Sequence, residues 1–152
     1  MLQRMNLGVL VAAVAGGIFG LVTTFEGAVA RSVGAINASL LEHLFAGLIA
    51  IPAVIILFMR GNLTWVNMRP VLPMAALLGI FVLVAVAGVA YAMPRVGVMA
   101  GNMAMLFGQM TIAVLIDTIG FSGYDKVPLS LPRIVGLVLM VIGIYLVLPR
   151  QP

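Results

Sequence analysis

The amino-acid sequence predicts an all-α integral membrane protein, and three observations lead to that fold class. Hydrophobic residues make up 64% of the 152 residues and charged residues only 8%, whereas soluble domains carry about a quarter charged residues. The mean hydropathy is +1.27. Five apolar windows have roughly the length that a helix needs to cross about 30 Å of hydrocarbon. A chain this small cannot bury so much apolar surface internally, so most of it must face lipid.

These windows predict five transmembrane helices that form one domain over residues 1–152. We place the helices at about 7–24, 35–59, 71–91, 97–119 and 134–148. Residues 60–65 and 120–128 collect turn formers and charges, so they are predicted surface loops. Residues 93–96 are predicted to form a tight turn between an antiparallel third and fourth helix, and Pro132 and Pro149 bracket the fifth. Aromatic residues near the predicted span ends are typical of an interfacial belt: Trp65, Tyr91, Tyr124 and Tyr145.

The first helix carries small residues at every fourth position, which predicts a ridge where another helix packs closely. The ridge residues are Gly8, Ala12, Gly16, Gly20 and Thr24. Arg4, the apolar run and residues 28–30 also outline a cleavable signal peptide. The length of the run, the acidic Glu26 near the would-be cleavage site and the packing ridge favour a retained helix instead.

The eight Lys and Arg residues give a net charge of +4 but are scattered singly between apolar runs, which is not the pattern of a nucleic-acid-binding surface. With five spans, one side of the membrane would carry five basic residues and the other three. This difference favours a cytoplasmic N-terminus only slightly, so insertion in both orientations is physically allowed. A single fixed orientation remains the alternative.

An odd number of helices suggests half of a transporter. Transporters commonly place substrate between two inverted halves, yet no internal repeat is apparent in this chain. The missing half would come from a second copy inserted upside down, or from a partner chain of opposite orientation. We therefore expect an antiparallel homodimer or a pair with a homologous chain.

Glu42 is the clearest candidate for a substrate-binding or proton-binding residue. It lies about seven residues into the second predicted helix, hence about 10 Å along its axis. A carboxylate at that depth raises the free energy of membrane insertion by about 2.5 to 3.5 kcal/mol unless it is protonated, paired or in a water-filled cavity. If the helix starts later, Glu42 instead reaches the interface. The neighbouring His43, the sole histidine, points about 100° away and is expected to be a packed or interfacial side chain.

Four further polar residues are candidates for lining a path. Glu26 and Arg31 are placed beyond the first span, where they form an interfacial salt bridge or Glu26 faces a vestibule that attracts cations. Asn102 and Gln109 lie seven residues apart on nearly one face of the fourth helix, followed by Thr111 and Asp117. The amides either hydrogen-bond between helices or line the path. Asp117 is near the helix end, where it caps the helix or pairs with Lys126.

The sequence contains no signature of enzyme chemistry. It has no cysteine, a single histidine, no G-x-S-x-G, no H-E-x-x-H and no phosphate-binding glycine loop. We therefore expect neither a catalytic residue, a metal site nor a cofactor.

The chain resembles the YdcZ-type family of the drug/metabolite transporter (DMT) superfamily, over nearly its whole length. The resemblance is carried by the order and spacing of several short pieces: Gly108-Gln109, Leu115-Ile116-Asp117 with Gly120, Pro128-Leu129, Arg133-Ile134-Val135-Gly136 with Gly143, and residues 38–47 of the second helix. Two departures are Glu26, where the family tends to have Gln, and the pair Glu42-His43, where small polar or aromatic residues are usual. Both departures add ionisable groups.

The resemblance implies a bacterial inner-membrane protein, half of a ten-helix inverted-repeat transporter with an exporter role. We expect a secondary transporter subunit that moves a small cationic or amphipathic solute by alternating access, with a proton-coupling role for Glu42. The alternative is a non-transporting assembly or structural subunit that packs its glycine ridges against a larger membrane partner.

Overall fold

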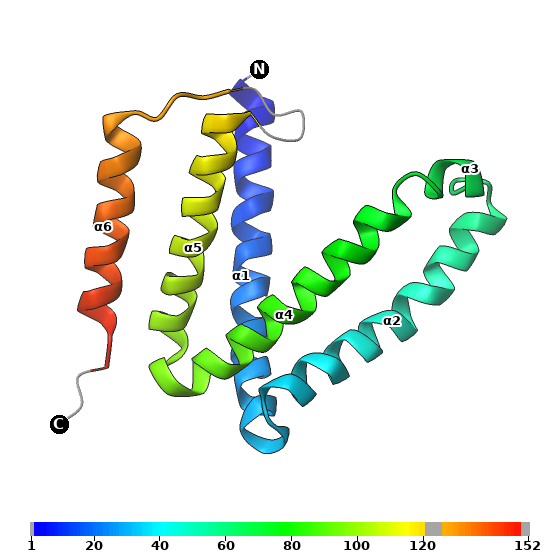
Figure 1. The fold of residues 1–152 in the computed structure, drawn as a ribbon, viewed down its shortest axis with the longest axis horizontal. Coiled ribbons are helices and arrows are strands. Elements are labelled where there is room, and N and C mark those ends of the chain that lie inside the picture. The colour runs from blue at the N-terminus through cyan, green and yellow to red at the C-terminus, as the bar shows by residue number, and fades with distance from the viewer. Residues whose placement is uncertain (1, 121–125, 150–152) are drawn as a thin grey trace. The chain divides into compact units, whose positions relative to one another are not determined.

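A computed structural model describes residues 2–120 and 126–149, and these residues form helices joined by short connectors (Figure 1). The fold is therefore all-α over the described residues, as predicted. In chain order the helices are α1 (Leu2–Val33), α2 (Ala35–Met59), α3 (Trp65–Met68), α4 (Leu72–Val96), α5 (Val98–Ile119) and α6 (Leu131–Val147). Of the predicted belt residues, Trp65, Tyr91 and Tyr145 have exposed side chains and Tyr124 lies outside the described residues.

Four helices are long and apolar enough to cross a membrane. The candidate spans are Leu7–Val33, Ala35–Met59, Leu72–Val96 and Val98–Ile119, and α6 is a shorter apolar helix of 17 residues. Large apolar side chains on these helices face outward; Ile49, for example, is 76% exposed and Val9 is 70% exposed. Such an apolar exterior is stable only against lipid or other membrane helices, because water would penalise it.

The first helix is longer than predicted. The predicted end near residue 24 is wrong, because α1 continues through Glu26 and Arg31 to Val33. The apolar window ends before the charged Glu26 and Arg31, but no proline interrupts this segment and the helix continues through both residues. Glu26 is thus a helical residue rather than part of a connector.

The connector after α4 is shorter than predicted. Residues 93–96 do not form the turn; they are the last turn of α4, with Pro94 inside the helix. The chain reverses at one residue, Gly97, whose φ of 84° and ψ of 156° are open to glycine alone. At the other end of the chain, Pro132 lies in the first turn of α6, where proline fits because the N–H it lacks would have no helical partner.

The helix α6 packs against α5. A Cβ atom built on Gly143 of α6 would lie 3.0 Å from Cε of Met103 of α5, so the glycine lets the thioether lie directly on the α6 backbone. This contact shows how a small residue brings two apolar helices together where burial from water gives little driving force.

The structure reveals an internal repeat of a helix, a glycine and a second helix. The first repeat is α1, Gly34 and α2, and the second is α4, Gly97 and α5. Gly34 has φ 86° and ψ 154°, nearly the values of Gly97. In both repeats the glycine N–H donates to the carbonyl four residues earlier, and its carbonyl accepts from the N–H four residues later. No internal repeat is apparent from the sequence alone, so this shared backbone geometry is a feature that sequence reasoning missed.

Burial follows the same 63-residue spacing. Four buried residues of the first repeat have buried counterparts in the second, namely Thr23 and Val86, Gly27 and Ala90, Ala30 and Met93, and Ala38 and Gly101; the counterparts of the buried Glu26 and Ser39 are only partly buried. Within the paired helices the identical residues are few: Ala12-Ala13 with Gly16 against Ala75-Ala76 with Gly79, Val33-Gly34 against Val96-Gly97, Ile49-Ala50 against Ile112-Ala113, and Ile56 against Ile119. Backbone geometry thus preserves a relationship that the side chains have almost lost.

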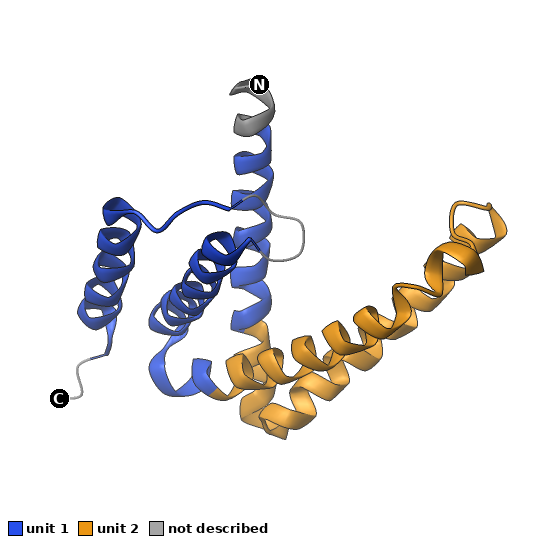
Figure 2. Cartoon of the chain, turned by 45° about the horizontal axis from the view of Figure 1, so that its top comes forward, with its two compact units in different colours: residues 1–24, 92–152 blue, residues 25–91 orange. Residues whose placement is uncertain are grey.

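The described chain divides into two compact units, coloured separately in Figure 2. Unit 1 comprises residues 1–24 and 92–152, and unit 2 comprises residues 25–91. Unit 1 therefore combines most of α1, from the first repeat, with α5, from the second. Unit 2 makes the reverse combination of α2 with most of α4. The small core of unit 2 consists of Ala30, Ala38 and Ala90, with Ala35 packed against them.

Candidate functional site

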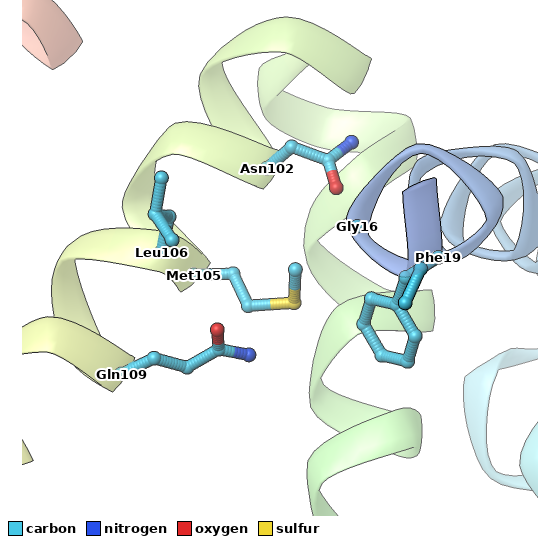
Figure 3. A pocket seen from close by; sticks show the side chains of 7 residues that line it. Gly16, Phe19, Asn102, Met105, Leu106 and Gln109 are labelled. Atoms are coloured by element: carbon cyan, nitrogen blue, oxygen red, sulfur yellow. The ribbon is translucent and has the colours of Figure 1, made fainter. Parts of the chain in front are cut away.

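A pocket lies between α1 and α5 within unit 1. Its volume is about 510 Å³, and its lining is mostly apolar. Figure 3 shows Asn102, Met105, Leu106 and Gln109 on α5 facing Gly16 and Phe19 of α1. Gly16 belongs to the small-residue ridge of α1, and its lack of a side chain leaves open space beside the α1 backbone.

The amide of Asn102 joins the two helices that form the pocket. Its Nδ2 donates to the carbonyl oxygen of Val98 at 2.9 Å, which leaves Oδ1 to accept from Oγ1 of Thr23 at 3.0 Å. The Thr23 hydroxyl is fully buried and also lies 3.0 Å from the carbonyl oxygen of Gly20. Asn102 therefore both holds α5 on α1 and presents one unused N–H.

Gln109 is the polar group of the pocket that is free to bind a solute. It lies two turns further along α5 than Asn102, as the seven-residue spacing requires. Its side chain is exposed and has no hydrogen-bond partner within the described part of the chain. An amide offers two donors and an acceptor, so it can orient a polar group of a bound molecule. Thr111, the next polar residue, donates to Phe107 of its own helix.

The two candidate glutamates belong to unit 2 and do not line this pocket. Glu42 lies on α2 with a half-buried side chain. Glu26 lies near the end of α1, is only 6% exposed, and its Oε1 has no hydrogen-bond partner among the described residues. These two carboxylates of unit 2 are the second grouping of candidate residues.

The predicted salt bridge between Glu26 and Arg31 is not formed. Glu26 is buried, whereas the Arg31 side chain is exposed. Five residues along a helix turn the side chain by about 140°, so the two groups point to different sides of α1. The prediction failed because it placed both residues in an irregular connector, where such a contact would be possible.

Asp117 pairs with a different basic residue from the one predicted. Its Oδ2 lies 3.2 Å from Nη1 of Arg133 on α6, and no ion pair joins it to Lys126. The Arg133 nitrogen lacks the alignment of a hydrogen bond, so the contact is electrostatic. The backbone carbonyl of Asp117 accepts from the N–H of Val127 at 2.8 Å. Asp117 thus fastens the connector and α6 to the end of α5, away from the pocket.

Sequence reasoning missed two buried hydroxyl residues. Thr23 and Ser39 are both fully buried. Ser39 of α2 donates from Oγ to the carbonyl oxygen of Leu83 of α4 at 2.9 Å, as Thr23 does toward Asn102 in unit 1. Both hydroxyls are short and easily satisfied by their own helix, so hydropathy alone does not mark them. Ser39 follows Gly34 by five residues, as Asn102 follows Gly97, and this shared position was the usable signal.

His43 is held by its own helix. Its Nδ1 lies 2.8 Å from the carbonyl oxygen of Ser39, so the tautomer that donates from Nδ1 leaves Nε2 as an acceptor. No group of three or more potential metal ligands occurs within residues 2–120 and 126–149. A second surface pocket, of about 510 Å³, lies at α3 and contains Trp65, Arg69 and Pro73, none of which is a candidate site residue.

The apolar exterior and the mostly apolar pocket with its two amide side chains define the class of protein: a multi-pass helical membrane protein with room for a solute between helices. Comparison with known families specifies this class further. Residues 7–146 match a family described as "Putative inner membrane exporter, YdcZ". The chain belongs to this family and is a multi-pass protein of the inner membrane. The family is one of membrane exporters rather than enzymes. No curated protein and no solved structure matches the chain.

Proposed function

We propose that the protein is a secondary transporter subunit that exports a small cationic or amphipathic solute across the inner membrane. The observation that carries this proposal is the pocket between α1 and α5, where apolar walls surround the free amide of Gln109. Membership of an exporter family supports the same conclusion. Apolar pockets with a few polar groups are the usual form of small-molecule sites.

The transport unit is an antiparallel dimer that works by alternating access. The argument starts from size: four candidate spans and a shorter apolar helix are few for a conduit, and transporters are commonly built from two inverted halves. In this proposal α6 is a fifth span, since its 17 residues reach the lower limit for crossing a bilayer with local thinning. A second copy in the opposite orientation supplies the other half.

The site residues take different roles in this proposal. Gln109 orients the solute by hydrogen bonds, and Asn102 positions α1 against α5 while contributing its remaining N–H. Glu42 exchanges a proton against the solute, and the buried Glu26 keeps the surroundings of Glu42 negative. Asp117 has a structural role through its ion pair with Arg133.

The direct test is uptake of tetraphenylphosphonium, a lipophilic cation, into proteoliposomes under an imposed pH gradient. Loss of the Gln109 hydrogen bond in Gln109→Leu should raise the KM about 2- to 10-fold, because such a bond contributes roughly 0.5–1.5 kcal/mol. Thr118→Val is the matched control, since Thr118 is exposed and its hydroxyl bonds to Val114 of its own helix. Uptake that is equal in protein-free liposomes would reject the proposed function.

Proton coupling is tested separately in the same proteoliposomes. Glu42→Gln keeps the size of the side chain but cannot release a proton. We expect the variant to retain solute exchange without a gradient at saturating solute concentrations, and to lose accumulation driven by the pH gradient. Unchanged accumulation would remove Glu42 from the coupling step, while transport itself would stand.

A further inference from the structure

The two units place equivalent helices in contact. In unit 1 Asn102 of α5 bonds to Thr23 of α1, whose hydroxyl reaches the carbonyl of Gly20. In unit 2 Ser39 of α2 bonds to the carbonyl of Leu83 of α4. Ser39 is the counterpart of Asn102 in the 63-residue spacing, and Leu83 is the counterpart of Gly20. In both units, therefore, the first helix of one repeat contacts the second helix of the other repeat. These pairs are α1 with α5 in unit 1, and α4 with α2 in unit 2.

This equivalence predicts a second groove in unit 2, between α2 and α4. Each side chain of the α1–α5 pocket has a counterpart there, found by adding or subtracting the same spacing. The counterparts of Ala15, Gly16, Phe19, Asn102, Met105, Leu106 and Gln109 are Leu78, Gly79, Val82, Ser39, Glu42, His43 and Ala46. Gly79, like Gly16, has open space where a side chain would begin.

The second groove differs from the first in charge and in side-chain size. Phe19, Asn102 and Gln109 are replaced by the smaller Val82, Ser39 and Ala46, whereas Ala15 is replaced by the larger Leu78. The position of the neutral Met105 is taken by the carboxylate of Glu42. The repeat thus pairs a neutral, amide-bearing pocket with an acidic groove.

The two glutamates of unit 2 form no ion pair within that unit. All of residues 25–91 are described, and none of its three arginines, Arg31, Arg60 and Arg69, forms an ion pair with Glu26 or Glu42. Glu26 is 6% exposed, and its Oε1 lacks a hydrogen-bond partner among the described residues. A buried carboxylate without a partner is costly in a membrane, so a nearby cationic group would stabilise it.

We propose that the α2–α4 groove around Glu42 is the repeat-related counterpart of the α1–α5 pocket and binds the charged group of a lipophilic organic cation. This inference rests on the proposed transport function and adds where the charge is bound. The carboxylate supplies the charge, and the apolar walls of the groove exclude the water that would otherwise screen it. Glu42 is thus a specificity-determining residue for positively charged solutes.

The equivalence makes a strict prediction, because the carboxylate can be moved from one groove to the other. Glu42→Met gives the second groove the residue of the first, and Met105→Glu does the reverse. We expect Glu42→Met to weaken tetraphenylphosphonium binding at least 10-fold in lipid nanodiscs, measured by equilibrium dialysis. The double variant Glu42→Met/Met105→Glu should bind within about 3-fold of the unaltered protein, because the charge returns to an equivalent position.

The control moves the carboxylate to α5 but outside the pocket. Glu42→Met/Thr118→Glu places it on an exposed residue near the end of the same helix and should not restore binding. If circular dichroism shows that Glu42→Met alters the helicity of the protein, Glu42→Gln replaces it, because glutamine preserves the size of the side chain. Glu42→Gln should show the same loss of binding. Rescue by both double variants would show that only overall charge matters and would overturn the inference.

The outcomes also separate this inference from the proposed function. If the unaltered protein transports the cation but Met105→Glu fails to rescue a folded Glu42→Met, the repeat-related groove is wrong and the transporter stands. Unchanged binding in Glu42→Met also overturns the inference. If the unaltered protein neither binds nor transports the cation, both are overturned.

Discussion

Gly34 and Gly97 are the residues that determine where the chain reverses. Their φ angles of 86° and 84°, with ψ near 155°, lie in a region that residues with a Cβ atom essentially do not occupy. Each glycine also continues the hydrogen bonding of the helix before it and begins that of the helix after it. One residue thus replaces a whole connector, which keeps the backbone polar groups paired where lipid offers them no partner.

Replacing either glycine by alanine should destabilise the protein by about 1–3 kcal/mol, the cost of forcing a side chain into this backbone conformation. The measurement is unfolding in mixed detergent micelles, followed by circular dichroism. Gly88→Ala is the matched control, because Gly88 is helical and a Cβ there meets no atom within 4 Å. It should be neutral or slightly stabilising. Equal effects of the three substitutions would contradict the role of the reversal glycines.

At the scale of helices, α6 is attached by packing on α5 and by one ion pair. Gly143 accepts the side chain of Met103, and Arg133 reaches Asp117 at 3.2 Å. The two charged side chains are 30% and 37% exposed, so the pair is partly screened. Packing therefore contributes most of the free energy that holds α6 on α5, and the ion pair determines the position of α6 along α5.

A double-mutant cycle tests this pairing. Asp117→Asn, Arg133→Gln and their combination should give a coupling free energy of about 0.2–1 kcal/mol, typical of partly exposed pairs. The same cycle with Lys126→Gln in place of Arg133→Gln should give a coupling near zero, because Asp117 does not pair with Lys126. The measurement is again unfolding in mixed micelles. A larger coupling free energy with Lys126 than with Arg133 would support the pairing of Asp117 with Lys126 that the sequence predicts.

Hydropathy was sufficient to predict an all-helical membrane protein, because runs of apolar residues and their connectors reflect the bilayer directly. It placed the helix over Ala35–Met59 with the bounds that the structure has. It ended α1 and α4 too early, since Glu26, Arg31 and Pro94 look like connector residues. Side chains at helix ends can be polar without breaking the backbone, so composition does not determine where a helix stops.

The candidate site was harder to predict than the fold. Helical spacing was enough to group Asn102 with Gln109, and both line one pocket. It did not reveal Thr23 as the partner of Asn102, because that contact joins helices 79 residues apart in sequence. Nor did it reveal the repeat, whose marks are Val33-Gly34 and Val96-Gly97 and the two alanine–glycine segments. Tertiary pairing of helices is not encoded by the period of a single helix.

At the scale of the whole molecule, the account claims that one chain is half of a transport unit completed by an inverted copy. The weak asymmetry of basic residues allows both orientations. The absence of cysteine makes labelling unambiguous, and Asn62, which is exposed in the α2–α3 connector, offers a single site as Asn62→Cys.

The most direct measurement is the fraction of Asn62→Cys that a membrane-impermeant maleimide labels in sealed, right-side-out inner-membrane vesicles, relative to detergent-solubilised vesicles. The variant must first retain uptake of tetraphenylphosphonium. The account predicts labelling of about half of the protein, because the two copies of each dimer expose the loop on opposite sides. Labelling of essentially all or none of the protein would show one fixed orientation and contradict the inverted homodimer.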